Sequence, residues 1–195
     1  SATRNFMITV LNDAPIIDLD NTTAGNNFAT SFTEDVNSNL PITNNTTITD
    51  VDNTNMTSAT ITLTNNLDGI TDENIALTAA QITAADGLGI TVNVATNNVI
   101  SLSGSSSIAN YQTVIKQIVY NNTSQNPSTT NRYITVLIND GTANSNTATT
   151  TISINPVNDI SVVTLDNTSS FTEGNTNLSV INNLTITDSD NTTLN

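Results

Sequence analysis

The sequence predicts an all-β protein made of tandem β-sandwich repeats. Along many short segments apolar residues alternate with Thr, Ser and Asn, and this period-two pattern is typical of strands that bury one face. Turn-forming pairs such as Asp140-Gly141 separate the segments. Long blocks of sequence also recur in the same order, which indicates a repeat architecture.

The predicted strands are rich in Ile, Val and Thr, whose β-branched side chains suit a pleated sheet. They cover residues 5–11, 46–49, 58–64, 90–94, 99–102, 118–121, 133–139 and 148–154. Residues 107–115 differ, because Ile108, Tyr111 and Ile115 follow a helical spacing. We predict a short helix there, with Tyr111 closing one edge or end of the sandwich.

The repeat is the most specific feature of the sequence. Residues 11–22 (LNDAPIIDLDNT) recur as 157–168 (VNDISVVTLDNT), residues 31–34 (SFTE) as 170–173, and residues 40–50 (LPITNNTTITD) as 178–188 (LSVINNLTITD). Three blocks in one order, with rare Phe and Glu matched, are improbable as chance. We expect residues 1–12 to be the last strand of a preceding repeat, 13–158 one complete repeat and 159–195 the start of the next. A longer natural polypeptide is expected at both ends.

Composition excludes several classes of function. The chain has no His, Cys or Trp, so Ser-His-Asp and Cys-His catalysis and zinc sites built on His or Cys are ruled out. Three Lys and Arg stand against 17 Asp and Glu, for a net charge of −14. Nucleic acid and anionic membranes are therefore not expected as partners, and no apolar run reaches transmembrane length. Cations are the natural partners of such a surface.

The ordered motifs resemble bacterial cadherin-like repeats of giant adhesins and other large surface proteins, and are similar to the cadherin-related repeats of chondroitin-sulfate proteoglycans. The resemblance rests on residues 11–15 (LNDAP), 32–34 (FTE), 48–52 (ITDVD), 108–112 (IANYQ), 118–123 (IVYNNT) and 138–141 (INDG). It departs at the second junction, where residues 158–161 read NDIS. The resemblance implies extracellular, immunoglobulin-like or cadherin-like β-sandwiches joined end to end, with Ca²⁺ at the junctions.

Carried over residue by residue, the resemblance implies two sets of calcium ligands. One junction would use Asn12, Asp13, Glu34, Asp50 and Asp52, the other Asn158, Asp159, Glu173, Asp188 and Asp190, with Asp140 as a further candidate and Asp18, Asp20 and Asp166 fitting less clearly. Calcium chemistry agrees, since this ion takes six to eight oxygen ligands. On a strand, Asp50 and Asp52 would share a face. Alternatively, such Asp and Asn residues only form Asx-turns at strand ends.

The other acidic residues, Asp68, Asp72, Glu73 and Asp86, are expected in solvated loops. An enzyme is not expected, because Glu34 and Glu173 are one position of the repeat and no Trp offers a sugar platform. Two functions remain open: a calcium-rigidified spacer or stalk at the cell surface, such as part of an adhesin, or a subunit of a self-assembling extracellular filament, sheath or surface layer. The expected partners are neighbouring repeats or identical chains. A third function, an adhesive ligand-binding module, is not favoured, because few exposed aromatic residues or long charged loops are available to form a site.

Overall fold

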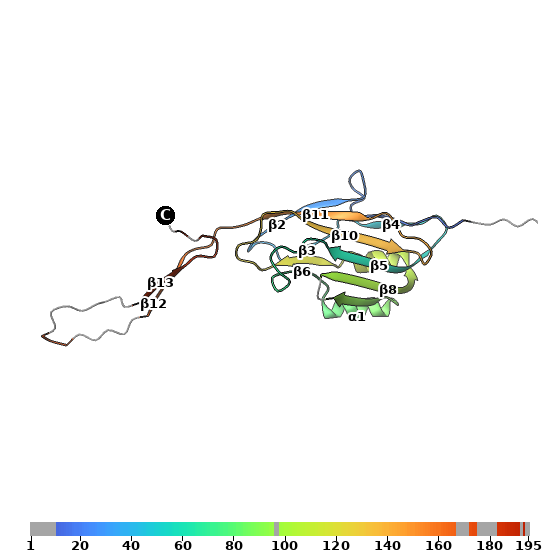
Figure 1. Ribbon diagram of the computed structural model, residues 1–195. Coiled ribbons are helices and arrows are strands. Elements are labelled where there is room, and N and C mark those ends of the chain that lie inside the picture. Colours follow the sequence, from blue (N-terminus) through green and yellow to red (C-terminus); the bar gives the residue numbers. More distant parts are fainter. Residues whose placement is uncertain (1–10, 96–97, 167–171, 175–182, 192, 194–195) are drawn as a thin grey trace, which may run out of the picture.

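Two layers of β-sheet enclose the apolar core of the computed structural model (Figure 1), which describes residues 11–95, 98–166, 172–174, 183–191 and 193. The larger sheet has six strands in the order β2 (Phe28–Thr33), β11 (Ala148–Asn155), β10 (Arg132–Asn139), β5 (Asn55–Leu63), β8 (Val99–Ser107) and β7 (Thr91–Ala95). Neighbouring strands are antiparallel except β2 and β11, which are parallel. The all-β prediction is confirmed.

Two smaller sheets and a helix complete the sandwich. One sheet pairs β1 (Ile16–Asp18) with β4 (Thr47–Thr49), and the other has the order β3 (Leu40–Pro41), β9 (Val119–Asn122) and β6 (Glu73–Ala76). Across the core, the ring of Phe32 on β2 meets that of Tyr120 on β9 edge-on, with centroids 5.5 Å apart. The layers are thus joined by interlocking side chains, as in close-packed sandwiches.

The predicted strands from residue 46 onward are confirmed to within a few residues, although β8 continues to Ser107. The strand expected at residues 5–11 lies almost entirely outside the described residues. The predicted helix is α2 (Ile108–Ile115), capped by the side chain of Ser107. Tyr111 on this helix is fully buried, and its hydroxyl donates to the carbonyl of Gly104 at 2.7 Å.

A second helix, α1 (Ala79–Gly87), was not predicted. It begins at a capping box, in which Thr78 accepts from the N–H of Gln81 and the Gln81 side chain accepts from the N–H of Thr78. The helix buries only Ala85, so it carries no apolar stripe that periodicity could detect. The Thr-x-x-Gln spacing was the one signal of its start.

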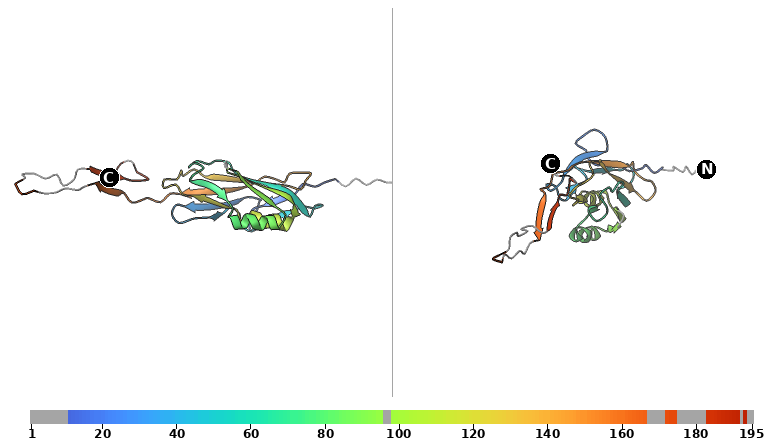
Figure 2. Two further views of the ribbon diagram at one scale, coloured as in Figure 1. Left: turned by 90° about the horizontal axis from the view of Figure 1, so that it is seen from below. Right: turned by 60° about the vertical axis from the view of Figure 1, so that its left-hand side comes forward.

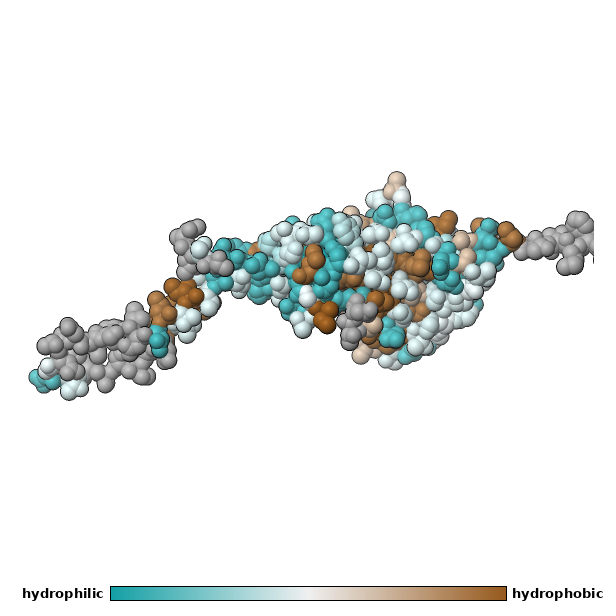
Figure 3. Space-filling view, viewed as in Figure 1, coloured by the Kyte–Doolittle hydropathy of each residue, from teal (hydrophilic) through white to brown (hydrophobic). Residues whose placement is uncertain are grey.

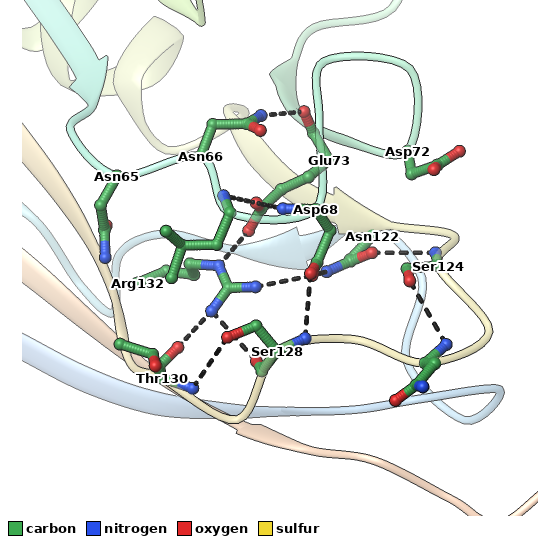
Figure 4. A network of polar contacts seen from close by, with 12 residues as sticks. Asn65, Asn66, Asp68, Asp72, Glu73, Asn122, Ser124, Ser128, Thr130 and Arg132 are labelled. Carbon is green, nitrogen blue, oxygen red and sulfur yellow. Dashed lines mark hydrogen bonds and ion pairs between the residues drawn. The ribbon is translucent and has the colours of Figure 1, made fainter. Parts of the chain in front are cut away.

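A buried ionic cluster centred on Arg132 joins β6, β10 and two loops (Figure 4). Arg132 is 0% exposed, its Nε donates to Glu73 Oε1, and its Nη2 lies 2.6 Å from Asp68 Oδ2. The hydroxyl of Tyr120 donates to the same Glu73 oxygen at 2.6 Å, and burial raises the pKa of Tyr120. The expectation of solvated Asp68 and Glu73 is therefore wrong, whereas Asp86 is exposed, on helix α1.

The hairpin of β12 (Val162–Asp166) and β13 (Asn183–Thr187) repeats the pairing of β1 with β4. Val163 faces Ile186 in the hairpin as Ile17 faces Ile48 in the sandwich, which matches the offsets of the sequence repeat. Val163 is 58% exposed, however, whereas Ile17 is fully buried under the rest of its sandwich. The hairpin lies beyond the end of the sandwich opposite to residues 11–15 (Figure 2).

The close approach of strand β8 at Gly104 to Gly89, in the segment after helix α1, gives a testable prediction. Gly104 has a φ of +126°, and a Cβ there would collide with the carbonyl oxygen of Gly89. Gly104→Ala should therefore lower the free energy of unfolding by about 2–4 kcal/mol, since both backbone strain and overlap oppose the methyl group. Urea denaturation measures this. Gly87→Ala is the matched control: a Cβ there meets nothing within 4 Å, and it should leave stability unchanged or raised. Equal effects of the two changes would contradict the prediction.

Candidate metal centres at the two ends of the sandwich

The ends of the strands bring the predicted ligands into two groups, one at each end of the sandwich. Strand β10 runs antiparallel to β5, so Asp140 after β10 lies beside the loop that precedes β5. Strand β2 runs parallel to β11, so Glu34 after β2 lies beside the linker that follows β11. Consistent with this, the N–H of Val157 donates to Glu34 Oε2 at 2.8 Å.

The first group combines the N-terminal linker with two loops of the sandwich. Asn12 Nδ2 donates to Asp140 Oδ2 at 2.9 Å, and the N–H of Asp13 donates to Asp52 Oδ2 at 3.2 Å. Asn53 Nδ2 donates to Asn12 Oδ1 at 2.9 Å. Burial opposes ionisation of Asp140, but hydrogen bonds from Ala143, Asn12 and Thr142 outweigh it and lower its pKa.

The second group is built in the same way, one repeat later. The N–H of Asp159 donates to Asp190 Oδ2 at 2.5 Å, and Asn191 Nδ2 donates to Asn158 Oδ1 at 3.3 Å. Ser161 Oγ donates to Asp188 Oδ2 at 2.8 Å, and this bond, followed by those from the backbone, lowers the Asp188 pKa. An open depression of about 460 Å³ is lined by residues of this group, including Asp159 and Asp188.

Glu34 belongs to the second group, not the first, which corrects the assignment made from the resemblance. It is 2% exposed, and burial is the main cause of its raised pKa, with the charges of Asp190 and Asp159 adding to it. A carboxylate with a raised pKa destabilises the native state when ionised, so at neutral pH Glu34 calls for a positive partner. Its Oε1 is buried without a hydrogen-bond partner among the described residues.

The two Asp-x-Asp motifs lie in turns after β4 and β13 rather than on a strand, which corrects the expected shared face. Asp50 Oδ1 accepts from the N–H groups of Asp52 and Asn53, at 3.1 and 2.8 Å, and Asp188 Oδ1 makes the equivalent pair. The Asx-turn interpretation is therefore confirmed for one oxygen of each first Asp. The second oxygen of Asp50, Oδ2, is buried without a partner in the described structure.

The remaining candidates lie apart from this pattern. Glu173 is exposed. Asp20 is buried within its own loop, where hydrogen bonds led by that from Thr22 Oγ1 lower its pKa, and Asp18 accepts from the N–H of Asp20. The side chain of Asp166 lies outside the described part. Asn53 and Asn191 were missed, although both follow the Asp-x-Asp in register.

As they stand, the described residues contain no group of three or more Asp or Glu already arranged to hold a metal ion. Instead, backbone N–H groups of the linkers donate hydrogen bonds to carboxylate oxygens such as those of Asp52 and Asp190. Neither described helix is long and apolar enough to cross a lipid bilayer, a finding limited to the described residues.

Comparisons with known proteins give little further guidance. No family model matches the chain, and no curated protein matches it. A chain in a crystal structure of a CaDoc0917–CaCohA2 complex is similar at 12% identity and a TM-score of 0.34, over 65% of this chain and 96% of that one. A likeness this distant does not relate the two proteins.

Proposed function

We propose that the chain is a spacer repeat of a long extracellular surface protein, such as the stalk of an adhesin, stiffened by calcium at the repeat junctions. The supporting observation is a set of buried side-chain oxygens without hydrogen-bond partners. In the described structure these are Thr46 Oγ1, Asp50 Oδ2, Glu34 Oε1 and Asp159 Oδ2. Three of them are carboxylate oxygens of junction residues. Buried carboxylate oxygens normally have hydrogen-bond partners. A cation is therefore the natural partner for these three oxygens.

The residues present fit calcium, which binds carboxylate, amide and carbonyl oxygens and needs no nitrogen or sulfur. At the first end, Asn12, Asp13, Asp50, Asp52 and Asp140 would hold it, and at the second end Glu34, Asn158, Asp159, Asp188 and Asp190. Because Glu173 occupies the same position of the repeat as Glu34, it would bind calcium at the junction that follows its own repeat, just as Glu34 would at the junction after this sandwich. The bound ion would supply positive charge where these carboxylates meet.

Such a site would stiffen the connection between repeats. Glu34 comes from the sandwich, Asp159 from the linker and Asp190 from the following repeat, so ligands on three separate pieces of chain would be tied together. Without that tie, a short linker leaves neighbouring domains free to move. The absence of His and Cys and the repeated placement of the carboxylates fit a structural role better than an enzyme. Neighbouring repeats are thus the proposed partners.

Calcium titration of the 195-residue protein tests the proposal. Calorimetry should detect binding, and calcium at 100 times its dissociation constant should add about 2.7 kcal/mol to the free energy of unfolding, or about 5–10 °C in the melting midpoint. Asp188→Ala with Asp190→Ala should remove the calcium bound at the second end. Asp72→Ala with Asp86→Ala, an equal change of charge outside both groups, should not. Identical melting in calcium and in chelator would refute the proposal.

A further inference from the structure

The outer face of the six-stranded sheet carries no charged side chain. Strands β2, β5, β7, β8, β10 and β11 contain a single charged residue, Arg132, and its side chain is buried in the core. The net charge of −14 comes from Asp and Glu residues, all of which lie outside these six strands. We propose that this face docks a second copy of the chain, so that repeats associate side by side.

Small hydroxyl side chains of Thr and Ser make up much of the face. In one row across the sheet, Thr149 faces Thr135, which faces Thr62. In the next row, Thr60 lies between Leu137 and Ser101. The intervening residues of β10, β11 and the second half of β5 are buried in the core. Figure 3 looks onto this side of the molecule, and much of the surface over β5 and β8 has intermediate hydropathy.

Charge favours a second copy as the occupant of this face. Two chains that each carry −14 repel one another wherever their carboxylates meet, and like charges brought together across an interface cost several kcal/mol. The uncharged face avoids that repulsion, and its docking desolvates no ionised group. Thr and Ser can also hydrogen-bond across the interface while the Thr methyl groups pack. A polysaccharide is less suited to this face, which offers one aromatic residue, Tyr133, as a stacking platform.

The size of the face also suits a stable contact. Six strands spaced about 4.8 Å apart and five to nine residues long give a face of at most about 24 by 30 Å, or roughly 700 Å². Specific protein interfaces bury about 800 Å² per partner. Small side chains would further let two such sheets approach closely, since facing sheets are normally about 10 Å apart.

Sedimentation of the 195-residue protein in chelator and physiological salt tests the proposal separately from the calcium sites. The mass should rise from monomer to dimer or higher as concentration increases from micromolar to millimolar. Thr60→Glu should weaken this association at least tenfold, because it sets carboxylates against the partner's face. Ser101→Glu on the neighbouring strand should act alike and serves as the second variant if the first folds poorly, as judged by its melting midpoint.

The control is Ala84→Glu, which adds the same charge at an exposed position of α1, away from the face. It should leave the association within about twofold of the native protein. A native protein that stays monomeric at all concentrations overturns the proposal. So does equal weakening by Ala84→Glu and Thr60→Glu, since that would indicate general charge repulsion rather than a specific face.

Discussion

Arg132→Met is expected to lower the free energy of unfolding by about 3–5 kcal/mol, because it leaves two buried carboxylates without their cation. Glu73 is 0% exposed, and the Asp68 side chain is 7% exposed. Methionine fills much of the space that the arginine stem occupies, so the loss reports chiefly on charge and hydrogen bonding. Guanidinium or urea denaturation measures the effect, provided that the slope of unfolding free energy against denaturant concentration is the same for both proteins.

A double-mutant cycle separates the ion pair from its packing. Glu73→Gln alone should also destabilise the protein, since it removes charge from a group that accepts from Arg132, Tyr120 and the N–H of Leu67. Arg132→Met combined with Glu73→Gln should cost less than the sum of the two changes, because neither charge is then left alone. Additive effects, or a loss below about 1 kcal/mol for Arg132→Met, would show that the cluster is not an interacting unit.

The sequence pattern indicated the burial of Arg132 but not that of Glu73, and the charge of Arg132 argued against that indication. Arg132 is in phase with Ile134, Val136 and Ile138, and all four side chains face the core. Glu73 is likewise in phase with Ile75 on β6. Period-two alternation carried back one residue from the predicted strand at 133–139 would place Arg132 on the buried face, whereas the strand that carries Glu73 is too short to show such a pattern. In a strand, phase was the better guide than polarity.

Helix and strand positions were predictable where local periodicity is strong, as in β5, β10, β11 and α2. Strands β3 and β6 are too short for periodicity to reveal, because two to four residues define no pattern. The repeat matched the residues of one candidate ligand group with those of the other, because it depends on the order of residues and not on contacts. It did not reveal which end of the sandwich Glu34 occupies. That depends on the parallel pairing of β2 with β11, which joins residues more than 120 positions apart.

The position of Glu34 leads to a prediction that the substitution Glu34→Gln affects the melting midpoint differently in chelator and in calcium. In chelator, Glu34→Gln should leave the melting midpoint unchanged or raise it, because the change removes a buried negative charge near Asp159 and Asp190. In calcium, the same variant should lose at least half of the calcium-induced rise, because it removes a proposed ligand. A purely structural role would lower the midpoint equally in both conditions.

Glu173→Gln is the matched control, since Glu173 occupies the same position of the repeat but is exposed. If Glu34 serves the junction with Asp159 and Asp190, then Glu173→Gln should leave the calcium response of this chain unchanged. The assignment made from the resemblance predicts the reverse, with Glu173 needed beside Asp188 and Asp190. Melting both variants with and without calcium therefore decides which glutamate completes the junction. An unchanged calcium response in Glu34→Gln would show that Glu34, although placed beside the linker by the parallel pairing of β2 and β11, is not a calcium ligand.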